Sequence, residues 1–242
     1  MLSIFQKKKF LSDYLEGFTD FHNHLLPGID DGSENVQDSL EMIRKFNEFG
    51  VKNFVATPHV MGEYYPNTPE SIQAALEELL PALPQGNHMK AAAEYLMDQH
   101  FIDTLEKNEI LPVSGDRVLV EMSFFQAPIN LHEILFKLQN RGYRPILAHP
   151  ERYAFYHAKD LSKYEELKSR GCSFQLNMLS LTGHYGTGIQ KTAFQLLERN
   201  MIDYLSSDTH RLEHLEKVAT IRLSQKKMEK LVPVIEKSKS LF

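Results

Sequence analysis

The chain has 242 residues, of which 42% are hydrophobic and 24% charged, a composition that excludes a disordered, collagen-like or coiled-coil protein. Its 27 Lys and Arg against 32 Asp and Glu give a net charge of −5, so the chain lacks the general positive charge that binds nucleic acid or anionic lipid. The single cysteine, Cys172, cannot form an intrachain disulfide or a thiolate metal site, whereas eleven histidines are an unusual number.

Residues 1–17 precede the first predicted strand and are predicted to form an N-terminal extension. They include Lys7, Lys8 and Lys9 and lack the run of about 7–15 apolar residues that marks a signal peptide. No later segment reaches the roughly 18 apolar residues of a membrane span. We therefore expect a cytoplasmic protein without membrane insertion. The extension is amphipathic and is expected to pack on the domain, the alternative being a leader that does not pack.

From residue 18 onward, short apolar runs alternate with amphipathic segments of period 3.6, which is typical of β-α units around a parallel sheet. Strands are predicted at 18–22, 52–57, 89–95, 118–122, 144–148, 173–177 and 202–207. Helices are predicted at 35–49, 69–80, 130–141, 161–170, 188–199 and 212–237. Seven such units favour a single α/β domain over residues 18–242 that closes as a TIM-like (β/α)7 barrel, and an open doubly wound sheet is the alternative.

Metal-binding residue types follow six of the seven predicted strands. In parallel α/β folds the carboxyl ends of the strands meet at one face, where functional groups gather. Each histidine alone is compatible with an ordinary hydrogen-bonded loop residue, but their joint position predicts one metal centre. The residues in question are His22 and His24, Asp31 in the loop that follows, His59, Glu94, Glu121, His149, Asp208 and His210.

Two of the carboxylates are especially informative. Glu94 follows three alanines, and Glu121 stands within the run Val-Leu-Val-Glu-Met. A carboxylate buried in an apolar strand costs several kcal/mol unless it is paired or binds a cation. The alternative is a partly exposed strand end that pairs with an arginine.

The set of ligands also narrows the chemistry. Imidazole and carboxylate donors without thiolate suit Mn²⁺, Fe or Zn²⁺ and disfavour a calcium cage or a structural zinc site. Nine donors are too many for one ion and predict two or three, with Glu94 as a bridge, and clustered divalent ions favour phosphoryl transfer to water. Arg152 is placed to bind the phosphate, its alternative being a salt bridge to Glu151 or Asp160. His59 or His210 is a candidate proton donor to the leaving oxygen.

These motifs together carry a family resemblance. The run Asp-Phe-His22-Asn-His24-Leu-Leu-Pro-Gly-Ile-Asp-Asp31-Gly, with Thr-Pro-His59, Ala-His149-Pro-Glu-Arg152-Tyr and Asp208-Thr-His210, resembles the polymerase-and-histidinol-phosphatase (PHP) superfamily. More narrowly, it is similar to bacterial metal-dependent protein-tyrosine phosphatases of the CpsB/CapC type, over about residues 18–210. The resemblance implies a distorted seven-stranded barrel and a trinuclear centre, commonly with manganese, that hydrolyses phosphotyrosine.

Further roles are implied by the same resemblance. The substrate would be a phosphotyrosine protein, namely the tyrosine-rich tail of a bacterial tyrosine kinase that controls capsular or extracellular polysaccharide synthesis, and a homo-oligomer is possible. The family's second arginine has no clear match here. The first ion would be held by His22, His24, Glu94 and Asp208, the second by Glu94, Glu121 and His149, and the third by Asp31, His59 and His210, while Arg152 would bind phosphate.

Other functions remain open at this point. Cysteine-based phosphatases need an arginine six positions after the thiolate, but Met178 stands there relative to Cys172. A small-molecule phosphatase such as a histidinol-phosphate phosphatase is the main alternative. An amidohydrolase would bridge its metals with a lysine where the fourth strand here has Glu121, and a catalytically inactive metal-stabilised binding module is the non-enzyme alternative. Aromatic residues near the site that could flank a phenyl ring are Tyr64, Tyr65, Phe124, Phe125 and Tyr153.

Overall fold

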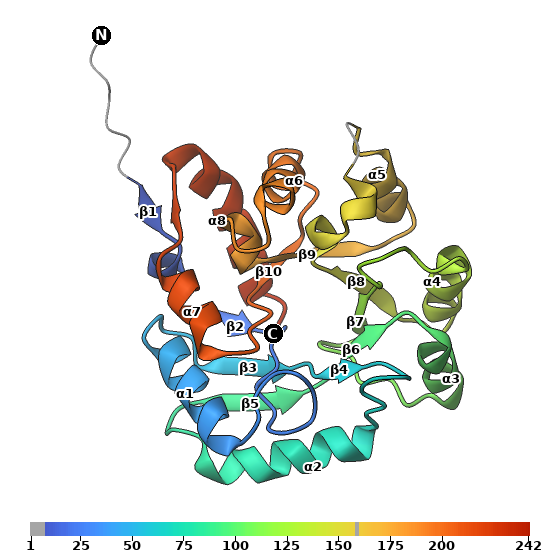
Figure 1. Cartoon of the computed structure of the whole chain (residues 1–242), viewed down its shortest axis with the longest axis horizontal. Helices are drawn as coiled ribbons and strands as arrows, with labels where there is room; N and C mark the ends of the chain where they lie inside the picture. Colours follow the sequence, from blue (N-terminus) through green and yellow to red (C-terminus); the bar gives the residue numbers. More distant parts are fainter. Residues whose placement is uncertain (1–7, 158–159) are drawn as a thin grey trace.

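The computed structural model of the chain describes residues 8–157 and 160–242. Strands form a ring and helices cover its outside (Figure 1). The strands of the ring are β2 (Thr19–Asp20), β3 (Asn53–Ala56), β4 (His59–Val60), β5 (His88–Ala91), β6 (Glu94–Leu96), β7 (Arg117–Glu121), β8 (Arg144–Ala148), β9 (Ser173–Asn177) and β10 (Tyr204–Ser206). The helices are α1 (Val36–Asn47), α2 (Pro69–Leu79), α3 (Gln99–Lys107), α4 (Leu131–Asn140), α5 (Ser162–Ser169), α6 (Thr187–Glu198), α7 (Leu212–Ala219) and α8 (Gln225–Lys239).

All strand pairs of the ring are parallel, but the ring consists of two sheets. One has the order β2-β3-β5 and the other the order β10-β9-β8-β7-β6-β4. The second predicted strand, 52–57, is found as β3, and the short strand β4 follows beyond its predicted end, while the third predicted strand is interrupted between β5 and β6. The predicted distorted barrel of seven units is therefore confirmed, and the distortion consists of the extra strand β4 and this interruption. As a result, His59 and Glu94 begin β4 and β6 as register partners instead of ending longer strands.

The barrel closes between β2 and β10 through side chains as well as backbone. A parallel bridge joins Asn23 to Thr209, and His24 N donates to Thr209 O. The buried Asp20 carboxylate accepts hydrogen bonds from the hydroxyl of Ser206 (2.7 Å) and from both the amide and the hydroxyl of Ser207 (2.8 Å each). We call this junction the seam. It places the segment after β2 beside the segment after β10.

Apolar residues fill the barrel in two layers. Inside the ring, alternate strand residues pack on one another, among them Phe21, Val55, Leu119 and Ile146. The ring of Phe242 lies 5.6 Å from that of Phe21, so the C-terminal residue closes the amino-end side of the barrel, near the axis of the ring in Figure 1. The larger core lies between strands and helices, because amphipathic helices such as α1 turn their apolar faces inward.

Helix boundaries follow local capping chemistry. The side chain of Asn35 accepts from Asp38 N at the start of α1, and Thr68 and Ser71 form a capping box on α2. Helix α3 was not predicted, although Asp98 caps it through a hydrogen bond from Phe101 N. None of the helices within the described ranges is long and apolar enough to cross a bilayer.

The predicted closing helix at 212–237 is wrong. The chain leaves α7 at Thr220, forms β11 (Arg222–Leu223) and starts α8 at Gln225 with Ser224 as its cap. Strand β11 pairs antiparallel with β1 (Lys9–Phe10), and Leu11 and Leu15 are buried beside it. The pairing partner lies at the other end of the sequence, so helical periodicity could not reveal this break. The rest of the predicted extension, residues 1–7, lies outside the described residues.

Candidate metal centre

The nine predicted metal ligands lie together at the carboxyl ends of the strands, around Glu94. Its Oε1 atom lies 3.1 Å from His22 Nε2 and 3.2 Å from His149 Nε2. Its Oε2 atom lies 3.0 Å from His59 Nδ1 and 3.6 Å from His24 Nε2. A carboxylate with both oxygens among four imidazoles is suited to bridging two cations.

One group of donors is formed by the two ends of the seam. Asp208 Oδ1 lies 3.3 Å from His22 Nε2 and 3.4 Å from His24 Nε2. His22, His24 and Asp208 are all buried, and their ligand atoms lie within 4.8 Å of one another. Because Glu94 contacts the same two imidazoles, the four residues predicted for the first ion lie together.

A second group surrounds Glu121. Glu121 Oε1 lies 3.1 Å from His59 Nδ1, and Glu121 Oε2 lies 3.9 Å from His149 Nε2. Glu94, Glu121 and His149, predicted for the second ion, are thus neighbours. His59 is an addition to this group that the sequence did not indicate.

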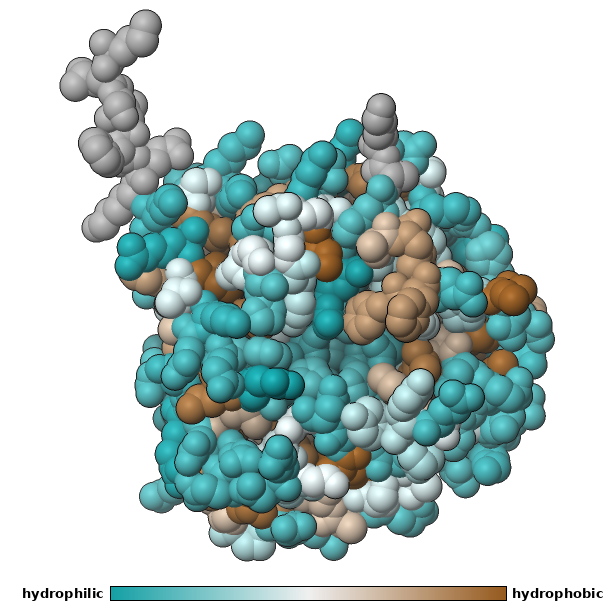
Figure 2. All heavy atoms as spheres, in the orientation of Figure 1, coloured by the Kyte–Doolittle hydropathy of each residue, from teal (hydrophilic) through white to brown (hydrophobic). Residues whose placement is uncertain are grey.

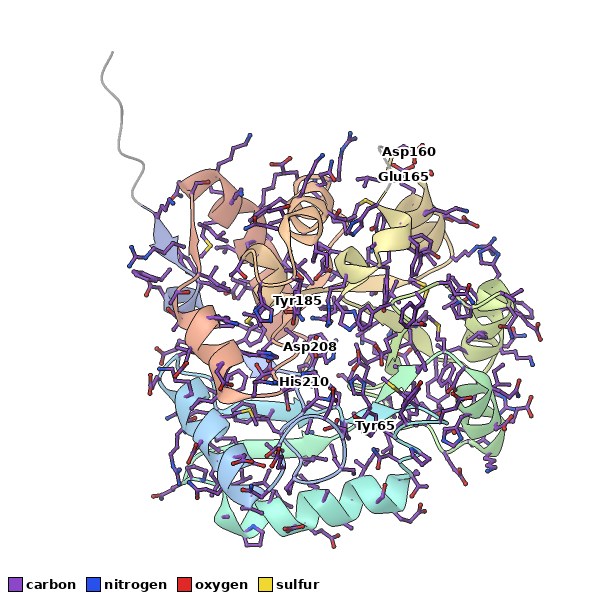
Figure 3. All side chains as sticks on the ribbon, in the orientation of Figure 1. Tyr65, Asp160, Glu165, Tyr185, Asp208 and His210 are labelled. Carbon is purple, nitrogen blue, oxygen red and sulfur yellow. The ribbon has the colours of Figure 1, made fainter. Side chains whose placement is uncertain are left out.

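The third group lies at the outer edge of the site. Asp31 Oδ1 is 3.5 Å from His59 Nε2 and 3.5 Å from His210 Nε2. These three residues and His24 offer ligand atoms within 4.8 Å of one another. His59 therefore lies between two groups, with one ring nitrogen facing each. In Figure 3, His210 and Asp208 lie together near the centre of the ring.

The buried donors lack the hydrogen bonds that a protein interior normally supplies. Nε2 of His22 and of His24, Nδ1 of His59, Oε1 of Glu121 and both carboxylate oxygens of Glu94 make no hydrogen bond of regular geometry with the described residues, although they lie close to one another. An unpaired buried polar group costs about 1–3 kcal/mol, and more when it is charged. Cations between these atoms would satisfy them, so the residues fit a metal centre.

In the site, buried carboxylates and imidazoles hold one another's charges. Burial alone would raise the pKa of Glu94, but His22 and His59 hold it well below its ordinary value. Burial likewise opposes ionisation of Asp208, yet His22 holds its pKa well below the usual range. Burial lowers the pKa of His24, and the carboxylate of Asp30 more than offsets this and raises it to about 10. The carboxylates therefore stay ionised, and their charge is balanced by protons on imidazoles such as His24, which a bound cation would displace.

Two residues that the sequence reasoning missed orient the imidazoles. His22 Nδ1 lies 2.9 Å from Gln175 Oε1, and Gln175 uses its amide NH₂ on Leu176 O. His24 Nδ1 lies 2.7 Å from Asp30 Oδ2. In both pairs Nδ1 is the donor, which leaves Nε2 free to bind a metal. The position of Asp30 beside Asp31 was a signal in the sequence, whereas nothing there distinguished Gln175.

Backbone conformation adds to the evidence that this site is specialised. His149 has φ 33° and Asp208 has φ 53°, which places both in the left-handed region that favours glycine. Such positions cost about 1–3 kcal/mol for other residues and cluster at functional sites. Both residues belong to the donor groups. The strained backbone conformations therefore occur at residues whose side chains point into the site.

Arg152 borders the first donor group. Its Nη1 donates a 2.7 Å hydrogen bond to Asp208 Oδ2, and the arginine makes this contact instead of the alternative salt bridge to Glu151 or Asp160. Its guanidinium lies 4.6 Å from the ring centre of Phe124 and 4.3 Å from that of Tyr185. The two rings hold the guanidinium plane through cation–π contacts.

Aromatic side chains surround the imidazoles. The ring of Tyr65 is stacked 5.8 Å from that of His59, and it lies across the centre of the ring from Tyr185 in Figure 3. Phe124 and Tyr153 each lie 5.7 Å from the ring of His149. By contrast, the predicted Tyr64 and Phe125 are strongly exposed, at 73% and 93%.

The thiol chemistry that the sequence excluded is also excluded by the structure. Cys172 is buried before β9, and burial raises the pKa of its thiol to about 12. A thiol with such a pKa is not a nucleophile at neutral pH. Any hydrolytic chemistry of the site therefore depends on its imidazoles, carboxylates and arginine.

The fold and the site together define the class of the protein. It is a parallel β/α barrel with several candidate metal-binding groups of histidines and carboxylates at the ends of its strands. The model of the family described as "Capsular polysaccharide synthesis, CpsB/CapC" matches residues 18–233. The chain belongs to this family, as the sequence resemblance predicted.

Individual relatives agree with this assignment. The chain is 29% identical over 198 residues to the tyrosine-protein phosphatase YwqE of Bacillus subtilis, with 80% of this chain and 78% of the relative covered. A crystal structure of YwqE from B. subtilis and CpsB from Streptococcus pneumoniae, described as unique metal-dependent tyrosine phosphatases, matches with a TM-score of 0.80 and 27% identity over 92% and 93% of the two chains. A histidinol phosphate phosphatase of Lactococcus lactis, 15% identical over 92% and 94% of the chains with a TM-score of 0.53, shares the fold.

Proposed function

We propose that the chain is a metal-dependent tyrosine-protein phosphatase, a phosphoric monoester hydrolase. The observation that carries the proposal is the position of Glu94, whose two buried oxygens lie among four imidazoles at the carboxyl ends of the strands. The activity named for YwqE and CpsB supports the phosphotyrosine substrate.

We propose three divalent cations, held as the donor groups suggest. His22, His24, Glu94 and Asp208 hold the first, Glu94, Glu121 and His149 the second, and Asp31, His59 and His210 the third. Manganese is the proposed metal, with iron or zinc as alternatives, because the donors are imidazoles and carboxylates without thiolate. When bound, such cations supply a water of lowered pKa and stabilise the charge on the phosphoryl oxygens.

The chain's own residues bind and orient the phosphate. Arg152 supplies a fixed positive charge, because its guanidinium contacts the rings of Phe124 and Tyr185 and Asp208 accepts from one nitrogen. A planar guanidinium binds phosphate oxygens with two parallel hydrogen bonds. Arg152 therefore neutralises charge that gathers on these oxygens as the ester bond breaks.

A proton must reach the leaving tyrosine oxygen, and the outer edge of the site offers two candidates. The side chains of His59 and His210 are 11% and 13% exposed, more than those of the inner imidazoles. Both also face Asp31, so ligation of the third cation and proton transfer compete for the same nitrogen atoms. Transfer by His59 or His210 stays a prediction.

The proposed physiological substrate is a cytoplasmic phosphotyrosine protein, the tyrosine-rich tail of a kinase of capsular or extracellular polysaccharide synthesis. The family description supports this setting. The catalytic unit proposed for this role is the barrel of residues 18–242, with residues 1–17 as its extension.

The test compares hydrolysis of a phosphotyrosine peptide, a phosphoserine peptide and histidinol phosphate by protein loaded with Mn²⁺, Fe²⁺ or Zn²⁺, with the metal content measured on the same samples. We expect the highest kcat/KM for the phosphotyrosine peptide and two or three metal ions per chain. Preference for histidinol phosphate would replace the proposed substrate. Bound metal without turnover of any phosphoester would favour a binding module.

A further inference from the structure

A series of aromatic rings leads from the candidate metal centre to the surface. Phe124, which contacts His149 and Arg152, lies 5.9 Å from the ring of Tyr153, and Phe155 is stacked 5.7 Å beyond Tyr153. Tyr153 is buried, so the series is anchored in the core, whereas its two phenylalanines reach solvent.

We call three exposed phenylalanines the phenylalanine rim: Phe124 and Phe155 of this series, and Phe125, which follows Phe124 in the chain. Phe124, Phe125 and Phe155 are 46%, 93% and 37% exposed. The space-filling view shows apolar side chains beside the hydrophilic hollow at the centre of this face (Figure 2). Exposed aromatic residues that adjoin a polar site are typical of surfaces that bind a partner.

We propose that the phenylalanine rim binds an apolar side chain next to the phosphotyrosine of the substrate protein. This inference rests on the proposed function. It adds a preference to that function: phosphotyrosine peptides with a large apolar residue beside the modified tyrosine are better substrates than peptides with small flanking residues.

Continuity with the site identifies the occupant as substrate. The ring of Phe124, a member of the rim, lies 4.6 Å from the guanidinium of Arg152 and 5.9 Å from the ring of Tyr153. An extended peptide advances about 3.3 Å per residue. When the phosphate of a peptide reaches Arg152, the side chains one or two residues away from the phosphotyrosine therefore lie near the rim.

The substitution for the test is Phe125→Ser, because Phe125 is the most exposed residue of the rim and has no part in the proposed catalysis. The matched control is Phe136→Ser, since Phe136 is 62% exposed on α4 and is not a chain neighbour of Phe124. Three substrates are compared: free phosphotyrosine, a phosphotyrosine peptide flanked by alanines, and the same peptide flanked by leucines.

We expect wild-type protein to have about tenfold higher kcat/KM for the leucine peptide than for the alanine peptide, the effect of burying one apolar side chain in part. Phe125→Ser should abolish most of this difference and leave free phosphotyrosine turnover unchanged, and Phe136→Ser should leave all three values unchanged. Equal values for the two peptides, an equal loss on free phosphotyrosine, or the same loss in Phe136→Ser would overturn the proposal. So would a dependence on protein concentration, because the rim would then join two copies of the chain.

Affinities for phosphonate analogues of the two peptides, measured by fluorescence anisotropy, separate this inference from the proposed function. If no substrate is turned over, the phosphatase proposal fails. A tighter wild-type affinity for the leucine analogue that Phe125→Ser removes would still support the rim, and equal affinities would overturn it.

Discussion

Arg152 and Asp208 share one hydrogen bond that connects two parts of the site. Arg152 Nη1 donates to Asp208 Oδ2 at 2.7 Å, while Asp208 Oδ1 lies 3.3 Å from His22 Nε2. Asn177 also donates to Asp208 Oδ2 at 2.7 Å. The carboxylate thus has one oxygen for the donor group and one for the arginine, so a candidate metal ligand positions the charge that we propose binds the phosphate.

The first prediction concerns Arg152→Ala. It should retain the metal content of wild-type protein and reduce kcat by about 10²–10³, the usual effect of removing one electrostatic donor to the transition state. Arg152→Lys should recover only part of the loss, because a lysine lacks the planar guanidinium that contacts Phe124 and Tyr185 and binds phosphate through two nitrogens. The check is steady-state kinetics with elemental analysis. Metal loss in Arg152→Ala as large as in a ligand variant would show that the arginine's main role is to hold Asp208.

His22→Ala should lose metal and activity together. His22 contacts both Glu94 and Asp208, so its removal opens the first donor group and one side of the bridge. Elemental analysis should show fewer bound ions, and a chelator should lower the melting temperature of wild-type protein more than that of the variant. Full metal content in His22→Ala would contradict the proposed ligand set.

Gln175→Ala tests the residue that orients His22. Without the acceptor at Nδ1, the imidazole loses its fixed orientation, and we expect metal affinity to fall about 10–100-fold. Saturating metal should restore most of the activity, since no ligand is removed. The measurement is a metal titration of activity, with the exposed Gln37→Ala as control. A kcat that remains low at saturation would instead indicate a direct role in the reaction.

The raised pKa of Glu151 should appear in the pH dependence of the free energy of unfolding. Burial raises the pKa of this fully buried carboxyl from 4.5 to about 7. Between these values the folded state holds a proton that the unfolded state releases, so the contribution of Glu151 to the free energy of unfolding falls as pH rises from about 4.5 to 7. Below this window the contribution is fully present, and above it the loss is complete.

Glu151→Gln cannot titrate and should therefore gain stability relative to wild type as pH rises, by about 3 kcal/mol between pH 5 and pH 8. Urea unfolding at the two pH values measures this difference. Glu165→Gln, an exposed substitution on α5, is the control and should show no such change. Parallel pH profiles for Glu151→Gln and wild type would contradict the raised pKa.

Asp20→Ala should destabilise the seam. The carboxylate accepts hydrogen bonds from Ser206, Ser207 and Asn23, and the variant leaves these buried donors without their acceptor. We expect a loss of about 3 kcal/mol in the free energy of unfolding. Urea denaturation provides the value, and Asp20→Asn, which keeps one acceptor oxygen, should lose less. A loss below about 0.5 kcal/mol in Asp20→Ala would mean that the seam is held by its backbone contacts alone.

The sequence predicted the features that depend on local pattern. Apolar runs such as Val-Leu-Val located β7, and polar residues after such runs located the donors, because parallel strands end at a common face. The sequence did not indicate which strands pair with one another. The interruption between β5 and β6 and the break between α7 and α8 arise from contacts with distant strands, and they left no periodic signal.

The same distinction applies to the site: the sequence indicated its metal-binding residue types but not the amides that contact them. Residues with unusual chemistry in apolar surroundings, such as Glu94 and Glu121, are conspicuous in a sequence. Gln175 and Asn177 are not, since an amide in a strand is ordinary until the structure shows that it contacts His22 or Asp208. The third donor group was assigned through the family resemblance, and the structure adds that His59 faces two groups at once.

The seam has a further consequence for how the chain is held together. His22 and Asp208 stand near opposite ends of the sequence, so a cation bound by both closes a loop of almost the whole barrel. Cross-links that close long loops restrict the unfolded chain most. With a single cysteine the protein has no disulfide to do this. The first cation would take the place of such a cross-link. Unlike a disulfide, it binds reversibly and can be removed by a chelator.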